Sequence, residues 1–121
     1  MLDYLRRGVD EWFSMCNNMK MARQLPLWIL EAAQQVAHAL AAERVLLFGS
    51  FAQADESRHS DVDLFVVAHT PLRPLDRIAV AQKALAQTPR PVDVIVYTPE
   101  ELRTVSSKFI DSILRSGIDL L

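Results

Sequence analysis

The chain has 121 residues, of which 50% are hydrophobic and 23% are charged, and its formal net charge is −2 at pH 7. This length suits one domain with a hydrophobic core of its own and is too short for two ordinary domains. The 13 basic and 15 acidic side chains argue against broad nucleic-acid affinity, because non-specific binding depends on Lys and Arg neutralising phosphates. Direct binding of nucleic acid is therefore not expected.

Cysteine use and hydropathy indicate the compartment. The single cysteine, Cys16, excludes an intramolecular disulfide and is compatible with a reducing cytosol. No stretch approaches the roughly 20 apolar residues that a helix needs to cross a bilayer. Charged side chains at Asp3, Arg6 and Arg7 interrupt the order that a signal peptide requires. We therefore expect a soluble cytoplasmic protein with no membrane association.

The first part of the chain is predicted to be helical. Residues 1–22 are predicted to form an N-terminal amphipathic helix, because apolar side chains recur near helical spacing from Leu2 to Met19. Residues 23–121 are predicted to form a single compact domain. The apolar stripe of this helix could pack on its own domain or on a partner protein. A second helix is expected after Pro26, with a stripe of five residues facing the sheet: Ile29, Ala32, Ala33, Val36 and Leu40.

A buried strand and a tight turn follow. The apolar run VLLF at residues 45–48 predicts the strand, which ends at Gly49-Ser50. Glycine has no Cβ atom, so the backbone can approach a ligand closely, and Ser50 can cap a short helix at residues 50–54 or bind a phosphate oxygen. By itself this pattern fits an ordinary strand-to-helix turn better than a phosphate site.

Two aspartates occupy alternate positions at the start of the next strand. Side chains alternate between the two faces of a strand, so Asp61, Asp63 and Phe65 share one face. The Cα atoms of the two aspartates would be about 6 to 7 Å apart, within reach of one or two divalent cations. Oxygen ligands with open positions suit Mg²⁺. An isolated pair of this kind is more often a polar strand end, and the glycine turn just upstream is what favours a metal site.

A third helix and a third strand complete the expected sheet. The helix is predicted from an apolar stripe at Leu75, Ile78, Ala81 and Leu85, with Asp76, Arg77, Gln82 and Lys83 exposed. In the strand at residues 92–97, the three valines should face the helices and leave Asp93, Ile95 and Tyr97 on the other face. If this strand lies beside the second one, Asp93 joins Asp61 and Asp63.

The C-terminal part contains two helix signals. Thr98-Pro99-Glu100-Glu101 begins a helix with Thr98 as its cap and Glu101 completing a capping box, so these acids are assigned a structural role. Another helix runs through Phe109 and Ile113 and ends near Gly117. Residues 118–121 could add a short edge strand.

Gly49-Ser50, ten intervening residues and Asp61-Val62-Asp63 resemble the signature of the DNA polymerase β-type nucleotidyltransferase superfamily, in particular its minimal nucleotidyltransferases. The resemblance covers residues 27 to 104. It implies an α+β fold, in which a small mixed β-sheet forms one of two layers and helices pack on one face. It also implies a third carboxylate on a later strand, where Asp93 stands.

The same resemblance implies a Mg²⁺-dependent enzyme that moves a nucleoside monophosphate, AMP from ATP, to an acceptor hydroxyl. Asp61 and Asp63 would hold two Mg²⁺ ions, and Gly49 and Ser50 would seat the β- and γ-phosphates. Asp93 would help to bind one metal and deprotonate the acceptor. Two metals about 3.5 to 4 Å apart can stabilise both the entering and the leaving oxygen of an in-line displacement. The sequence shows no identifiable reader of the nucleotide base.

Minimal nucleotidyltransferases commonly accompany a HEPN-domain ribonuclease toxin, act as its antitoxin and in some cases adenylylate a toxin tyrosine. A HEPN-domain toxin is thus the partner that the resemblance implies. After the sheet and its helices are assigned, no second domain is left to present the acceptor hydroxyl.

Two alternatives stay open at this point. Family members often carry Ala-Arg-Gly after the glycine turn, whereas this chain has Ala52-Gln53-Ala54, so a second hypothesis is an antitoxin that blocks its toxin by binding alone. Arg58 in the polar loop at residues 55–60 could partly replace the missing arginine. A third hypothesis is a small-molecule enzyme similar to aminoglycoside nucleotidyltransferases, which would need a homodimer or another chain to complete its acceptor pocket.

Overall fold

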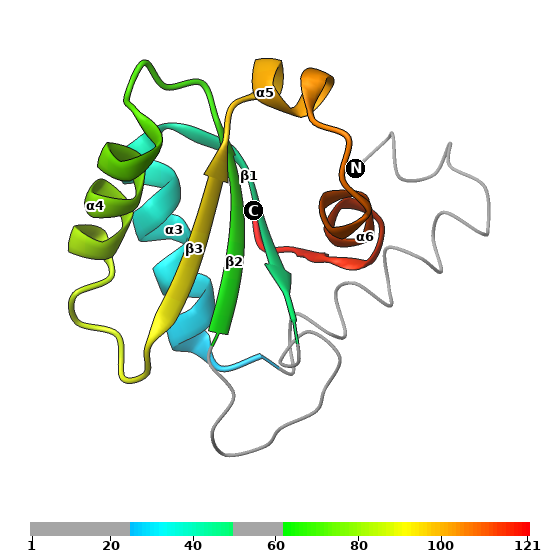
Figure 1. Ribbon diagram of the computed structural model, residues 1–121. Coiled ribbons are helices and arrows are strands. Elements are labelled where there is room, and N and C mark those ends of the chain that lie inside the picture. The colour runs from blue at the N-terminus through cyan, green and yellow to red at the C-terminus, as the bar shows by residue number, and fades with distance from the viewer. Residues whose placement is uncertain (1–24, 50–61) are drawn as a thin grey trace, which may run out of the picture.

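The structure is a computed structural model that describes residues 25–49 and 62–121. The predicted N-terminal helix, the turn residue Ser50, the helix expected at 50–54, the loop with Arg58, and Asp61 lie outside the described residues. The described elements follow one another along the chain as shown in Figure 1: α3 (Leu27–Leu40), β1 (Ala42–Phe48), β2 (Val62–Ala68), α4 (Pro74–Ala84), β3 (Val92–Tyr97), α5 (Pro99–Thr104), α6 (Lys108–Ser116) and β4 (Ile118–Asp119).

The strands form one mixed sheet in the order β3-β2-β1-β4. β2 and β3 are parallel and are joined through α4, whereas β1 runs antiparallel to both β2 and β4. The predicted neighbours, the strands that begin at residues 61 and 92, are therefore paired. The C-terminal edge strand is confirmed over Ile118–Asp119.

Helices α3 and α4 cover one face of the sheet and enclose the main hydrophobic core (Figure 1). All five residues of the predicted α3 stripe are buried. They belong to the same cluster as alternate residues of the two central strands: Val62, Leu64 and Val66 of β2, and Val92, Val94 and Val96 of β3. Each such side chain contributes about 1.5–3 kcal/mol when fully buried, so this face supplies most of the apolar stabilisation.

Helix α6 packs on the opposite face of the sheet. Its Ile110 and Ile113 form a second cluster with Leu46, Phe65 and Val67. The Ser107 hydroxyl caps the helix by accepting a hydrogen bond from the Ile110 backbone N–H at 3.3 Å. The α+β class and the mixed sheet are confirmed, but helices lie on both faces rather than on one. The reason is that β1 and β2 carry apolar side chains on both faces, and both need cover.

The predicted orientation of α4 is wrong in part. Ala81 and Leu85 are buried as expected, but Leu75 is 80% exposed and Ile78 is 39% exposed, while Arg77 is only 7% exposed. Arg77, Ala81 and Leu85 recur every four residues, so they share the side of the helix that faces the core. Arg77 tolerates this position because its charged group has partners on both sides.

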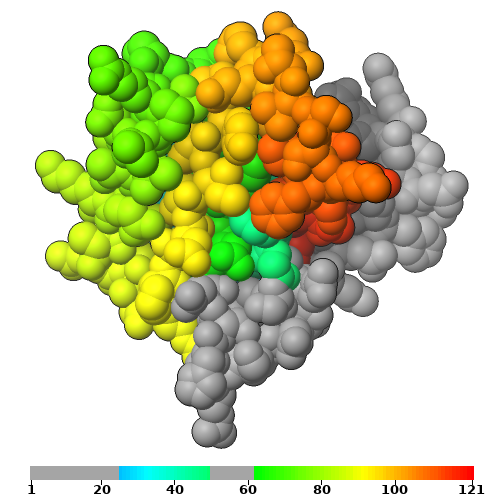
Figure 2. Space-filling view, in the orientation of Figure 1, coloured from blue at the N-terminus to red at the C-terminus, as the bar shows by residue number. Residues whose placement is uncertain are grey.

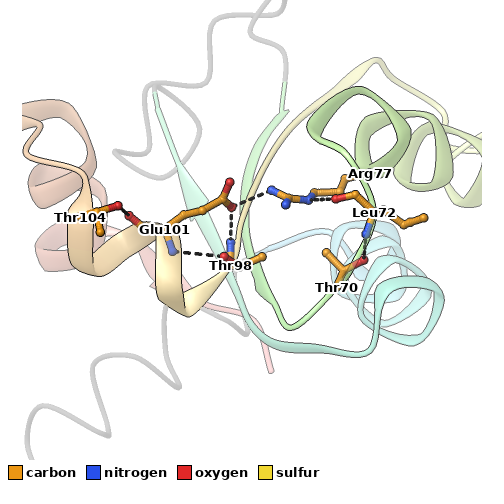
Figure 3. Close-up of polar contacts among 6 residues, drawn as sticks. All are labelled: Thr70, Leu72, Arg77, Thr98, Glu101 and Thr104. Carbon is orange, nitrogen blue, oxygen red and sulfur yellow. Dashed lines mark hydrogen bonds and ion pairs between the residues drawn. The ribbon is translucent and has the colours of Figure 1, made fainter.

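Those partners form a hydrogen-bonded network that joins α4 to α5 (Figure 3). Arg77 donates from Nε to the Leu72 carbonyl at 2.8 Å and from Nη1 to Glu101 Oε1 at 2.7 Å. The same carboxylate oxygen accepts the Thr98 backbone N–H at 2.8 Å, and the Glu101 N–H is bonded to Thr98 Oγ1 at 3.1 Å, which confirms the capping box. The hydrogen bond from the Thr98 N–H is the main cause that lowers the pKa of Glu101 below its ordinary value. The Arg77 guanidinium lowers this pKa further.

Candidate active site

Three side chains of the second sheet face lie in one row across three strands. Phe48 of β1 is paired with Asp63 of β2, and Asp63 is paired with Asp93 of β3. Neighbouring strands are about 4.8 Å apart, so the two aspartates are adjacent. In the next row, Phe65 and Ile95 lie under α6. The pairing expected from the sequence thus brings Asp63 and Asp93 together, and their catalytic role stays a prediction.

Gly49 lies directly against this row. Its φ of +79° is in the left-handed region, which glycine adopts at little cost. A Cβ atom at this position would collide with the Oδ2 atom of Asp63. Two independent constraints therefore require glycine here. The consequence is that the half-buried Asp63 carboxylate is packed onto the bare backbone at the end of β1.

The row forms part of a cavity of about 580 Å³ between the sheet and α6. This volume is within the range of about 300–1,000 Å³ that small-molecule sites span. Figure 2 shows atoms of β2 (green) and the end of β1 (teal) in a hollow between β3 (yellow) and α6 (orange). The lining combines carboxylates, hydroxyls and apolar side chains: Phe48, Gly49, Asp63, Asp93, Ile95, Phe109, Ser112, Ile113 and Ser116.

Residues 31–121 match the family model described as "Polymerase beta, Nucleotidyltransferase". The chain belongs to this nucleotidyltransferase family. The match includes the four elements that line the cavity beside Gly49, namely strands β1, β2 and β3 and helix α6. A comparison with curated proteins gave no match.

Solved structures with the same fold include toxin-antitoxin assemblies. A crystal structure of a toxin-antitoxin with AMP-PNP is 24% identical, with a TM-score of 0.59, over 76% of this chain and 72% of that one. A mutant of the toxin-antitoxin MntA-HpeT is 24% identical, with a TM-score of 0.56, over 73% and 67% of the two chains. A putative nucleotidyltransferase from Sulfolobus solfataricus is 21% identical, with a TM-score of 0.55, over 84% of each chain. At these identities the likeness establishes the nucleotidyltransferase fold.

The donor set of this nucleotidyltransferase fits Mg²⁺. Asp63 and Asp93 offer carboxylate oxygens side by side, and Mg²⁺ is usually bound by one or two protein carboxylates together with water and substrate phosphates. Within residues 25–49 and 62–121, no cluster of three or more metal-ligating side chains is found. The third predicted ligand, Asp61, and the predicted phosphate ligand, Ser50, lie outside these ranges. In the same ranges, no helix is long and apolar enough to cross a membrane.

Sequence reasoning missed the α6 wall of the nucleotidyltransferase cavity. Phe109, Ser112 and Ser116 are spaced so that they share one side of the helix, and all three line the cavity. Phe109 contacts Phe48 edge to face, with ring centroids 5.9 Å apart and ring planes at 81°. The predicted helix through Phe109 is confirmed, and Phe109 is 57% exposed on it. The available signal was the serine spacing, which gives α6 a second, partly polar side next to the one that carries Ile110 and Ile113.

Proposed function

We propose that this protein is an antitoxin that transfers AMP from ATP to a tyrosine hydroxyl of a HEPN-domain toxin, with Mg²⁺ as its cofactor. The proposal is carried by the row in which Asp63 and Asp93 lie side by side, next to Gly49 and at the cavity. Family membership supports nucleotidyl transfer as the reaction. The fold shared with toxin-antitoxin assemblies, one of them with AMP-PNP, supports ATP as the donor and a toxin as the acceptor.

The residues divide into metal ligands and phosphate ligands. Asp61, Asp63 and Asp93 would hold two Mg²⁺ ions, and the backbone at Gly49 with the Ser50 hydroxyl would seat the β- and γ-phosphates. Mg²⁺, when bound, neutralises the negative charge that develops on the phosphate oxygens. Asp63 and Asp93 are paired across two parallel strands, and two adjacent carboxylates would favour a bound cation at this row.

Asp93 is suited to the acceptor side of the reaction. It is exposed, whereas Asp63 is half-buried beside Gly49. In the proposed step the acceptor oxygen forms a bond to the α-phosphorus, and the bond from the α-phosphorus to the oxygen that bridges to the β-phosphorus breaks. Pyrophosphate leaves, and Asp93 accepts the proton of the acceptor hydroxyl. An exposed base can meet a hydroxyl that a second protein brings to the cavity.

The test is label transfer between purified proteins. The chain is incubated with Mg²⁺, ATP labelled on the α-phosphate, and the HEPN-domain protein encoded beside it. We expect label to enter that protein, and no label to enter from ATP labelled on the γ-phosphate. Asp63→Asn and Asp93→Asn should each reduce transfer about 10²–10⁴-fold, the usual contribution of a positioned acid or base. Asp76→Asn, an exposed acid on α4 away from the cavity lining, is the control and should retain transfer.

One result would replace this proposal with the binding hypothesis. If the two proteins form a tight complex and the toxin is inhibited, but no α-label is transferred by the unaltered chain, the protein is an antitoxin that acts by binding alone. The sequence feature behind that alternative is Gln53, which stands where family members often have arginine.

A further inference from the structure

We infer that the α6 wall of the cavity, formed by Phe109 and Ser112, is the subsite for the heteroaromatic base of the nucleotide. The inference rests on the proposed function, because it concerns where the substrate of that same cavity places its base. It goes beyond that function in assigning a base reader, for which the sequence offered no candidate.

The cavity has two chemically different halves. One half holds Asp63 and Asp93 beside the bare backbone of Gly49. The other half is apolar, with Ile95 in the next row of the sheet and Phe109 and Ile113 on α6, while Phe48 lies in the row of Asp63 and its ring contacts Phe109. A nucleoside triphosphate is divided in the same way, into a polyanionic chain that requires cations and a flat ring that prefers an apolar surface. One molecule can therefore match both halves at once.

Phe109 is the part of the apolar half that lacks cover. Its side chain is 57% exposed although it lines a cavity. The nearly perpendicular contact with Phe48 holds the ring in place and covers no more than one of its faces. A base that stacks on the other face would remove this apolar surface from water. Stacking of one base on one aromatic side chain typically changes affinity about 5- to 150-fold.

The serines of the wall favour a base over a tyrosine side chain of the partner. Ser116 donates its hydroxyl proton to the Ser112 carbonyl at 2.7 Å. Among the described residues, the Ser112 hydroxyl has no hydrogen-bond partner, and it lines the cavity next to Phe109. A base carries ring nitrogens and exocyclic groups around its rim that can bond to such a hydroxyl. A tyrosine carries a single hydroxyl, and the proposed reaction places that group at the acidic row.

The experiment compares ATP with inorganic tripolyphosphate, which has the phosphate chain but no base. Binding of each to the full chain is measured by titration calorimetry in the presence of Mg²⁺. We expect Phe109→Ala to weaken ATP binding about 5- to 150-fold and to leave tripolyphosphate binding unchanged. Phe109→Tyr keeps the ring and should bind ATP as the unaltered chain does. Leu75→Ala removes an 80% exposed side chain that lies outside the cavity lining, and should change neither affinity.

Each other result decides against the subsite. If Phe109→Ala leaves ATP affinity unchanged while label transfer to the toxin falls, the ring belongs to the acceptor and the inference is overturned, although the proposed function stands. If Phe109→Ala weakens ATP and tripolyphosphate alike, with a native circular dichroism spectrum, Phe109 supports the phosphate half instead. If the unaltered chain binds neither compound, the proposed function fails together with the inference.

Discussion

Charged side chains are paired differently at the two ends of strand β3: opposite charges meet at one end and like charges at the other. Beyond its carboxyl end, the Glu101 carboxylate meets the Arg77 guanidinium at 2.7 Å, and both groups also bond to the backbone. Near its amino end, Asp93 is paired with Asp63, which places two like charges in one row. The first arrangement stabilises the connection between α4 and α5. The second one places two carboxylates side by side at the candidate site, so the site and the structural ion pair lie at opposite ends of one strand.

Gly49→Ala, beside the paired aspartates, is expected to cause the largest combined loss of stability and AMP transfer. The substitution puts a Cβ atom against Oδ2 of Asp63 and places alanine at a φ of +79°. We expect a loss of about 1–2 kcal/mol in the free energy of unfolding from the backbone alone. AMP transfer should fall about 10²-fold, because a displacement of about 1 Å in a reacting group has that effect. Urea denaturation and label transfer measure the two losses separately.

Ala41→Gly is the matched control for that substitution. Ala41 ends α3 in the left-handed conformation, with φ at 51° and ψ at 48°, but lies outside the cavity lining. Glycine should relieve the strain and raise the free energy of unfolding by about 1 kcal/mol, with no change in transfer. If Gly49→Ala retained full transfer, the close packing of Asp63 on Gly49 would not matter to the reaction.

The next largest effect is expected beyond the carboxyl end of β3, where Arg77 and Glu101 form an ion pair. Glu101→Gln removes the charge that faces Arg77, whose side chain is 8% exposed. Gln can still complete the capping box, so the loss is that of a charged hydrogen bond, reduced because the Glu101 side chain is 36% exposed. We expect a decrease of about 1–2 kcal/mol in the free energy of unfolding at pH 7, measured by urea denaturation. AMP transfer should not change.

The difference in unfolding free energy between the unaltered chain and Glu101→Gln should depend on pH. The pKa of Glu101 is lowered in the folded state, so its carboxylate stabilises the fold above the unfolded-state pKa of about 4.3. That stabilisation is lost as the pH falls through the lower folded-state pKa. The difference between the unaltered chain and Glu101→Gln should therefore shrink below about pH 4. At the exposed neighbour Glu100, whose pKa is lowered chiefly by a backbone hydrogen bond, Glu100→Gln should show a smaller difference of the same sign, because solvent screens the charge.

The sequence was informative where periodicity alone decides the structure. The α3 stripe and the alternation of β2 and β3 were predicted correctly, because side chains on a regular helix or strand have a fixed direction. The orientation of α4 was not, since burying Arg77 depends on Glu101, a partner 24 residues away in the sequence. Polarity alone gave no sign of that pair and favoured the apolar but exposed Leu75.

The candidate site shows the same division between local and distant information. The turn and the strand aspartates form a local motif, and strand pairing then brought Asp93 to Asp63. Phe109 became part of the cavity only because α6 crosses the uncovered face of the sheet, far along the chain from the motif. A short helix with one apolar side and one serine side does not indicate from sequence which strand row it will face.

The smallest expected change in stability tests the pairing of Asp63 with Asp93 directly. Asp93→Asn removes one of the two charges in the row, so without Mg²⁺ the free energy of unfolding should rise by about 0.2–1 kcal/mol, while transfer falls about 10²–10⁴-fold. Asp119→Asn is the matched control, because it breaks an exposed pair with Arg44 at 3.4 Å and should lower stability by at most about 1 kcal/mol. Urea denaturation in EDTA and then in Mg²⁺ measures both. Added Mg²⁺ should stabilise the unaltered chain more than Asp93→Asn, since an ion that binds only the folded state stabilises it by mass action. If Asp93→Asn were less stable than the unaltered chain in EDTA, Asp93 would serve the fold, and the contrast between the two ends of β3 would be wrong.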